Sequence, residues 1–374
     1  MENLKFKEEL MKNGFAVVPD IIDAEECRTL QDEFWVFFER LSRGKLKRSD
    51  KSTWKSIYDF FPNHGMLFQH FSVGHMQAIW DIRQSKGVVK AFKHIWETKD
   101  LTVSFDGASF GLMPEVTNRG WQRSGWLHLD QSPHRNDFEC VQGWVTALDV
   151  GEGDATLTVL EGSHLLHAAF AKEFKLDTDK KYKGDWFKLE SKHVDWYRSQ
   201  GCVQRFVQCP AGSLVLWDSR TVHSGQQPVK GRAKPKNRIV CYVSMMPQKF
   251  LSLREREKKK WAALRGRMTT HWAAKHVKLF GKNPRTYGMP LPNTPDRIIP
   301  HFNARSAFLA GWENTTTCPL TIKDAEARKK AVYAIIKSQD RIKTERVAGN
   351  AKKRKRNSKK SEQALIIKFK SESK

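Results

Sequence analysis

The chain has 374 residues, 39% of them hydrophobic, and its 13 Trp and 22 Phe can fill the core of one large domain or two. It contains no run of about 18 apolar residues, which excludes a hydrophobic membrane-spanning helix. The six cysteines are scattered without a C-x-x-C pair. This spacing fits a reducing compartment better than it fits a disulfide framework or a zinc ribbon.

The net charge of +25 is concentrated in the last third of the chain. Residues 1–250 carry 35 Lys and Arg against 31 Asp and Glu, whereas residues 251–374 carry 31 against 10. A field of this sign attracts polyanions, and the basic run Lys352–Lys360 is typical of nuclear import signals. Residues 251–374 therefore have two interpretations, a solvated appendage and a nucleic-acid contact. We expect the protein in the nucleus or the cytoplasm.

The first hundred residues predict one strand and two amphipathic helices. Phe15–Val18 is the expected strand. Asp23 followed by Glu26 is a helix start signal, and the helix that follows has an apolar face as far as Leu41. Residues 75–97 predict a second amphipathic helix, with Gly87 as an interruption.

Short strands separated by turn residues dominate the next part of the chain, residues 101–247. A charged insertion with helical stretches, residues 167–200, interrupts them. Many short strands of similar spacing predict a mainly β fold with flanking helices, a double-stranded β-helix of the jelly-roll, cupin-like type. The expected strands lie within residues 101–114, 125–130, 140–150, 155–164, 202–209, 212–225 and 237–247.

The strand pattern stops after Pro247. Residues 250–280 predict one or two basic helices, residues 281–320 loops, and residues 321–347 a last helix. The sequence therefore predicts three domains. They are a jelly-roll domain with its N-terminal helices over residues 1–250, a basic helical and loop extension over 251–348, and a disordered basic tail over 349–374.

Candidate metal ligands occur at the end of one predicted strand and at the start of another. His128 and Asp130 are two residues apart, so in a strand both side chains leave the same face. His223 follows a predicted strand and supplies a third donor, because a jelly roll places distant strands side by side. Two imidazoles and one carboxylate leave three positions open on a metal, the pattern of non-haem Fe(II) oxygenases.

Such a site also needs a cation for the far carboxylate of 2-oxoglutarate. An arginine matches a carboxylate bidentately. We prefer Arg238, because it begins a predicted strand that fixes its direction. Arg232 is the rival, in the sequence GRAKPKN, which is typical of a mobile basic loop.

Residues 14 to about 247 resemble the phytanoyl-CoA dioxygenase-like family of Fe(II)/2-oxoglutarate oxygenases, in the order and spacing of GFAVVPDIIDAEEC, HLD, VQGWVTALDV, LTVLEGSH, GSLVLWDSRTVH and RIVCYV. The resemblance implies a double-stranded β-helix with Fe(II) on His128, Asp130 and His223. It implies 2-oxoglutarate and O2 as cosubstrates and places Arg238 at the cosubstrate arginine. Leu129 stands where many members have glutamine, so an acyl-CoA substrate does not follow from the resemblance.

The resulting hypothesis is a 2-oxoglutarate-dependent dioxygenase that hydroxylates or oxidatively demethylates an unidentified substrate, a small metabolite in the first instance. One alternative is a nuclear oxygenase whose nucleic-acid or protein substrate is recruited by the basic region. Another is a non-catalytic binding protein on the same fold. The presence of all three ligands and an arginine favours an enzyme.

Several further residues have a structural and a functional interpretation. His164 is interpreted as a structural turn residue, and His134 as a surface residue or a substrate contact. The spacing of His64, His70 and His75 argues against a second metal site. The remaining candidates are tryptophans that line a pocket or fill the core, and arginines that bind an anionic substrate: Trp121, Trp126, Trp144, Trp217, Arg119 and Arg123.

Overall fold

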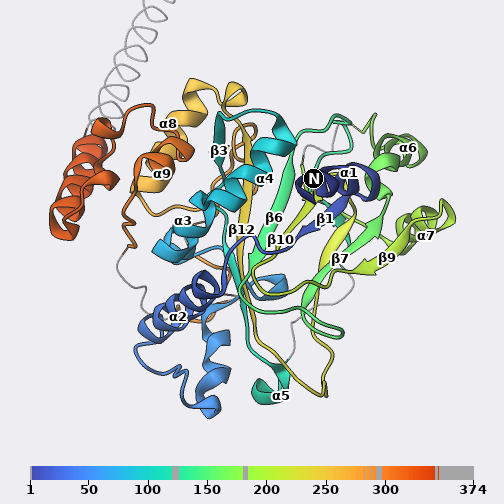
Figure 1. Ribbon diagram of the computed structural model, residues 1–374, viewed down its shortest axis with the longest axis horizontal. Coiled ribbons are helices and arrows are strands. Elements are labelled where there is room, and N and C mark those ends of the chain that lie inside the picture. Colours follow the sequence, from blue (N-terminus) through green and yellow to red (C-terminus); the bar gives the residue numbers. More distant parts are fainter. Residues whose placement is uncertain are drawn as a thin grey trace, which may run out of the picture. The chain divides into compact units, whose positions relative to one another are not determined.

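The computed structural model divides the chain into two compact units, Met1–Thr321 and Ile322–Lys374 (Figure 1). The first unit includes residues 251–321, so the boundary lies at 321 and differs from the expected one at 250. The residues that the structure describes are 2–119, 126–179, 184–281, 283–286, 288–291, 297–341 and 344.

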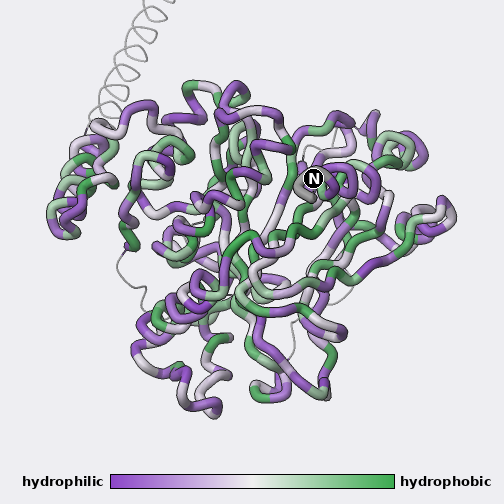
Figure 2. The backbone as a smooth tube through the Cα atoms, viewed as in Figure 1, coloured by the Kyte–Doolittle hydropathy of each residue, from purple (hydrophilic) through white to green (hydrophobic). Residues whose placement is uncertain are grey.

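The N-terminal helices form where the sequence predicts helix signals. Helix α2 begins after Asp23, whose side chain accepts hydrogen bonds from the backbone N–H groups of Glu25 and Glu26, while the Glu26 side chain reaches back in a capping box. Hydrophobic and hydrophilic residues alternate along α2, as expected for a helix with one packed face (Figure 2). The N-terminal helices are α1 (Glu2–Asn13), α2 (Ala24–Leu41), α3 (Gln77–Gln84) and α4 (Lys86–Trp96).

The helix expected over residues 75–97 is two helices, and the break lies at Ser85, not at Gly87. The Ser85 side chain accepts a hydrogen bond from the backbone N–H of Val88 and so caps α4. Gly87 serves close packing, because a Cβ there would lie 2.5 Å from the carbonyl oxygen of Ile21. Gly87 is the second residue of α4 and does not interrupt the helix.

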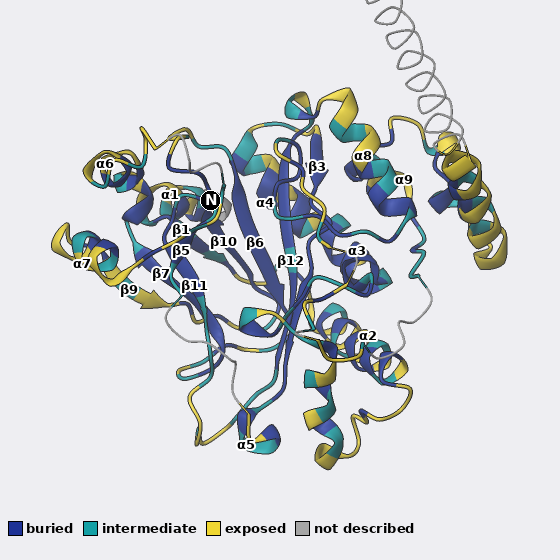
Figure 3. Cartoon of the chain, turned by 180° about the vertical axis from the view of Figure 1, so that it is seen from behind, coloured by how far each residue is buried: buried dark blue, intermediate teal, exposed yellow. Residues whose placement is uncertain are grey.

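The larger sheet is antiparallel, with the strand order β1-β10-β6-β12-β4-β2 and β3 also paired with β12. Helices α2, α3 and α4 contact β12. The central strands β6, β10 and β12 are buried along almost their whole length (Figure 3). The strands are β1 (Phe15–Val18), β2 (Leu67–Phe68), β3 (Leu101–Val103), β4 (Ala108–Gly111), β6 (Val141–Thr146), β10 (Leu214–Asp218) and β12 (Arg238–Pro247).

The smaller sheet is also antiparallel, with the order β8-β5-β11-β7-β9. One hydrophobic cluster contains Trp144, Val215 and Val240 from the larger sheet together with Leu157 and Val159 from the smaller one, so the two sheets share a core. The strands are β5 (His128–Leu129), β7 (Thr156–Glu161), β8 (Phe187–Lys188), β9 (Val203–Phe206) and β11 (His223–Gln226). The same part of the chain also contains helices α5 (Pro114–Thr117), α6 (His167–Glu173) and α7 (Ser191–Ser199).

Residues 251–321 pack into the first unit. Leu251 and Trp272 share a buried cluster with Cys140 and Met246. Of the helix expected over residues 250–280 only α8 (Leu253–Leu264) forms; beyond it Gly266 has a positive φ of 59° and the chain turns back. Helix α9 (Ala304–Leu309) follows in a region expected as loops.

The second unit contains a helix over residues 325–341, within the range expected for the last helix. Among the described residues, no helix has the length and apolar character that crossing a membrane requires. All six cysteines are buried and free.

Candidate metal centre

Two histidines face each other across paired strands of the smaller sheet. His128 begins β5, His223 begins β11, and they are direct partners in the antiparallel register. Their ring centroids are 4.3 Å apart. Nδ1 of His128 lies 3.0 Å from the carbonyl oxygen of Trp126, and Nδ1 of His223 lies 2.9 Å from that of Thr221. Because Nδ1 donates to a backbone carbonyl in each ring, the lone pair of Nε2 is left to bind a metal.

The carboxylate of Asp130 lies beside both Nε2 atoms. Its Oδ2 is 3.7 Å from Nε2 of His128 and 3.4 Å from Nε2 of His223. Gln142, on β6, donates a hydrogen bond of 3.1 Å to the same oxygen. Burial opposes the ionisation of Asp130, but the imidazoles of His271 and His128 outweigh it and hold the pKa of the carboxyl well below its usual range. The carboxylate is therefore ionised at neutral pH.

These three residues fit a divalent metal. One ligand atom from each of His128, Asp130 and His223 lies within 4.8 Å of the others. Burial, followed by the nearby His128, lowers the pKa of His223, which keeps its imidazole neutral and able to donate a lone pair. Two nitrogens and one carboxylate oxygen on one face suit Fe(II) with open positions.

The comparisons with known proteins identify the family. The family model described as phytanoyl-CoA dioxygenase (PhyH) matches residues 10–229. The chain belongs to this family of Fe(II)/2-oxoglutarate oxygenases. The Ava biosynthesis cluster protein O of Aspergillus versicolor is 28% identical to it over 261 residues, which cover 68% of this chain and 82% of that protein.

A solved structure shows the same fold as this PhyH protein. The hypothetical protein JW0805 of Escherichia coli at high pH has a TM-score of 0.55 and 16% identity, and the likeness covers 82% of this chain and 81% of that one. The PhyH match ends at residue 229, so Arg238 and all of residues 251–321 lie beyond it.

Aromatic rings surround the imidazoles of His128 and His223. Trp126 stacks on His128 with ring centroids 4.8 Å apart and planes 10° apart, and its Nε1 donates to the carbonyl of Gly225. Trp217 lies 5.4 Å from the ring of His223. Trp186, which is 51% exposed, lies 5.8 Å from the ring of His128 and did not stand out in the sequence. The rings hold the imidazoles in place and shield them from water.

Arg238 begins β12 and extends between the two sheets. Its side chain is buried, and Nη1 donates to the carbonyl of Ala155, the residue before β7, at 3.0 Å. The guanidinium carbon lies 4.9 Å from the ring centroid of Trp144. Nε is buried and has no hydrogen-bond partner among the described residues. An arginine fixed in this way retains a donor for an anion.

Arg232 is bound in ion pairs, so its description as part of a mobile basic loop is wrong for this side chain. It forms an ion pair of 3.1 Å with Glu115, and it pairs with Asp154 as well. Only 6% of the side chain is exposed. Both carboxylates neutralise its charge, which leaves Arg238 as the better candidate for the cosubstrate.

The other histidines singled out from the sequence do not belong to the ligand cluster that the described residues form. Nε2 of His164 lies 3.0 Å from the carbonyl oxygen of Met11, which agrees with its interpretation as a turn residue. His134 is exposed, with Nδ1 2.9 Å from the carbonyl oxygen of Asp177. His75 is fully buried, while His64 lies 5.2 Å from the ring of Trp126. Neither forms a metal cluster with His70 among the described residues.

Of the two arginines before the H-x-D strand, Arg119 lies over the ring of Tyr58, 4.2 Å from its centroid. Arg123 and Trp121 lie outside the described residues.

One residue beside the site was missed by the sequence analysis. Nδ1 of His271 lies 3.8 Å from Oδ2 of Asp130. His271 belongs to a stretch expected to be helical, and no local pattern connects it with the H-x-D motif. Only the packing of residues 251–321 against the sheets brings it there.

Proposed function

We propose that this protein is an Fe(II)- and 2-oxoglutarate-dependent dioxygenase that hydroxylates, or oxidatively demethylates, a small molecule. The observation that carries the proposal is the arrangement of His128, Asp130 and His223 around one point, in a chain of the PhyH family. The antiparallel sheets with a shared core support a double-stranded β-helix as the fold.

Each residue of the site has a distinct role in the proposal. His128, Asp130 and His223 would hold Fe(II), and Arg238 would bind the far carboxylate of 2-oxoglutarate. Iron and 2-oxoglutarate supply the oxidation of a C–H bond by dioxygen. The protein orients the cosubstrate through the guanidinium and lowers the access of water through the rings of Trp126 and Trp217.

The relative from Aspergillus versicolor supports a small-molecule substrate. Its name assigns that protein to a biosynthesis cluster, and the match covers 82% of its length. We therefore propose a metabolite with an oxidisable C–H bond as the substrate class. The exposed ring of Trp186 beside His128 offers such a molecule an apolar surface.

The test is succinate release from 2-oxoglutarate with Fe(II) and O2, screened over metabolite pools and nucleic acids. Wild-type protein should turn over 2-oxoglutarate, and Asp130→Ala should not. His134→Ala is the matched control, because His134 is exposed and its Nδ1 lies 2.9 Å from the backbone carbonyl oxygen of Asp177. Substantial turnover by a folded Asp130→Ala protein would refute the proposal.

The screen also separates the two alternatives. Stimulation by nucleic acid or a protein instead of metabolites would favour the macromolecular oxygenase, for which the excess of basic residues after residue 250 is the supporting observation. Binding of 2-oxoglutarate without succinate release under every condition would favour a non-catalytic binding protein.

A further inference from the structure

His271 extends the metal site beyond the part of the chain that the PhyH match covers. Its Nδ1 lies 3.8 Å from Oδ2 of Asp130, the oxygen that also faces His128 and His223. The side chain is only 12% exposed. A carboxylate oxygen has two lone-pair directions, so one can bind a metal while the other faces a neighbouring donor. Gln142 donates a hydrogen bond of 3.1 Å to this oxygen, whereas His271, at 3.8 Å, lies beyond hydrogen-bond distance and acts on it electrostatically.

Hydrophobic packing fixes the backbone that carries His271. The next residue, Trp272, is 1% exposed and belongs to the buried cluster with Cys140 and Met246. The guanidinium of Arg135 lies 5.0 Å from the ring centroid of Trp272. Trp272 is therefore held on both sides, and His271 has little freedom to leave Asp130.

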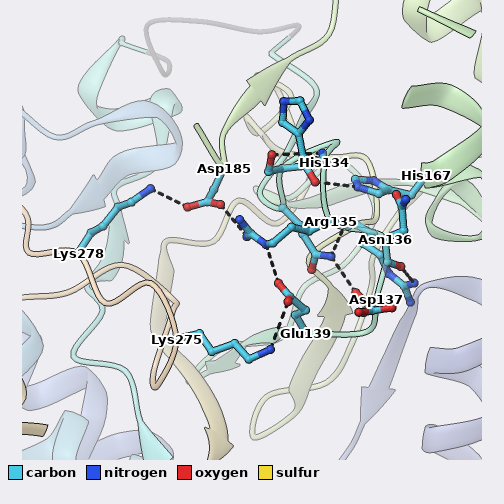
Figure 4. A network of polar contacts seen from close by, with 12 residues as sticks. His134, Arg135, Asn136, Asp137, Glu139, His167, Asp185, Lys275 and Lys278 are labelled. Atoms are coloured by element: carbon cyan, nitrogen blue, oxygen red, sulfur yellow. Dashed lines mark hydrogen bonds and ion pairs between the residues drawn. The ribbon is translucent and has the colours of Figure 1, made fainter. Parts of the chain in front are cut away.

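A network of ion pairs links Arg135, Glu139 and Asp185 to Lys275 and Lys278 of the same segment (Figure 4). Arg135 pairs with Glu139 and Asp185, each at 2.7 Å. Lys275 extends the network to Glu139 at 3.2 Å, and Lys278 extends it to Asp185 at 2.6 Å. Glu139 and Asp185 are only 10% and 11% exposed, so these contacts are better shielded than surface ion pairs. The network joins the segment after the H-x-D motif to the segment that carries His271.

We propose that His271 is a positioning residue for the metal ligand Asp130, acting through its Nδ1 together with the amide of Gln142. The proposal rests on the proposed function, because it assumes that Asp130 binds the metal. Residues that orient a metal ligand commonly change metal affinity by about 10–100-fold when they are removed. The segment that carries His271 thereby supports the metal site without supplying a ligand.

Co(II) is the probe, titrated into the full-length protein under anaerobic conditions and followed by visible absorption. His271→Ala should bind Co(II) about 10–100-fold more weakly than wild type and show an altered spectrum. His276→Ala is the control from the same segment, because the ring of His276 packs on Trp272, with centroids 5.2 Å apart, and its loss tests the effect of packing alone. It should bind Co(II) as wild type does, and thermal unfolding should show that both variants are folded.

Two conservative variants identify the nitrogen that acts. The amide of asparagine can place a donor near the position of Nδ1, and the amide of glutamine can place one near Nε2, which is buried and has no hydrogen-bond partner among the described residues. His271→Asn should restore Co(II) affinity and His271→Gln should not. Restoration by glutamine alone, or unchanged affinity in His271→Ala, would overturn the proposal. If wild type showed no Asp130-dependent Co(II) binding, the proposed function itself would fail.

Discussion

His223 lies directly opposite His128 in the register of two antiparallel strands. Directly opposed residues on one face of such a pair have Cβ atoms about 4.5–5.5 Å apart. Each Nδ1 atom is held by the backbone carbonyl of the residue two positions earlier, Trp126 at 3.0 Å and Thr221 at 2.9 Å. The sheet register therefore sets the separation of the two imidazoles and the preceding carbonyls set their tautomers, while Asp130 completes the donor set from the position just after β5.

This geometry predicts that metal binding stabilises the fold. Co(II) at about 100 times its dissociation constant should raise the free energy of unfolding of wild type by about 2.7 kcal/mol, because only the folded state assembles the three donors. Chemical denaturation with and without Co(II) measures the gain. Co(II) should not raise the free energy of unfolding of Asp130→Ala, and it should raise that of His134→Ala as much as that of wild type. Equal stabilisation of all three proteins would show that the metal binds at another site.

The two arginines should respond differently to substitution. Arg238→Ala should weaken 2-oxoglutarate binding by about 2–5 kcal/mol, the range for truncating one partner of a buried charge pair. Isothermal titration with 2-oxoglutarate in the presence of Co(II) measures this loss.

Arg232→Ala is the matched control for cosubstrate binding. It should leave the affinity for 2-oxoglutarate unchanged but lower the free energy of unfolding by about 3 kcal/mol, because Glu115 and Asp154 lose their shared partner. The opposite result, weak cosubstrate binding in Arg232→Ala and normal binding in Arg238→Ala, would exchange their roles.

His75 should make the fold sensitive to acid. Burial, with a contribution from the nearby Arg83, lowers its pKa to about 4, although the backbone of Arg267 favours the protonated ring. The unfolded chain binds a proton near pH 6.5 and the folded chain does not until about pH 4. The contribution of the neutral His75 ring to the free energy of unfolding is therefore fully present above about pH 6.5. Roughly 3 kcal/mol of it is lost as the pH falls from there to about 4.

Urea unfolding at pH 7.5 and pH 4.5 tests this, with His75→Gln as the variant without a titratable group at this position. The stability difference between wild type and His75→Gln should shift in favour of the variant by that amount as the pH falls. A difference independent of pH would show that His75 is not held neutral in the fold.

We propose that the basic residues at the end of the chain contact nucleic acid and direct the protein to the nucleus. Deletion of residues 349–374 should reduce nuclear enrichment and lower nucleic-acid affinity, more strongly at low than at moderate salt. Turnover of a small substrate should be unchanged, because all site residues precede the deletion. If the truncated protein kept its nucleic-acid affinity and its localisation, the segment would serve only to increase solubility.

The sequence by itself determined the local features of this protein. The Asp23 and Glu26 side chains cap α2, and the strand patterns of Leu214–Asp218 and Arg238–Pro247 were predicted, because hydrogen bonding to the nearest backbone and the periodicity of apolar residues are local properties. The family was also identified from ordered motifs and is confirmed by the match over residues 10–229. The candidate ligands His128, Asp130 and His223 were named from spacing and resemblance alone.

Only the tertiary structure decided what depends on contacts between distant segments. It paired His128 with His223, engaged Arg232 with Glu115 and Asp154, and brought His271 to Asp130. It also assigned residues 251–321 to the first unit, because the apolar side chains of Leu251 and Trp272 are buried against Cys140 and Met246. Charge and periodicity describe each of these segments separately, whereas burial and ion pairing depend on which surfaces meet in the folded chain.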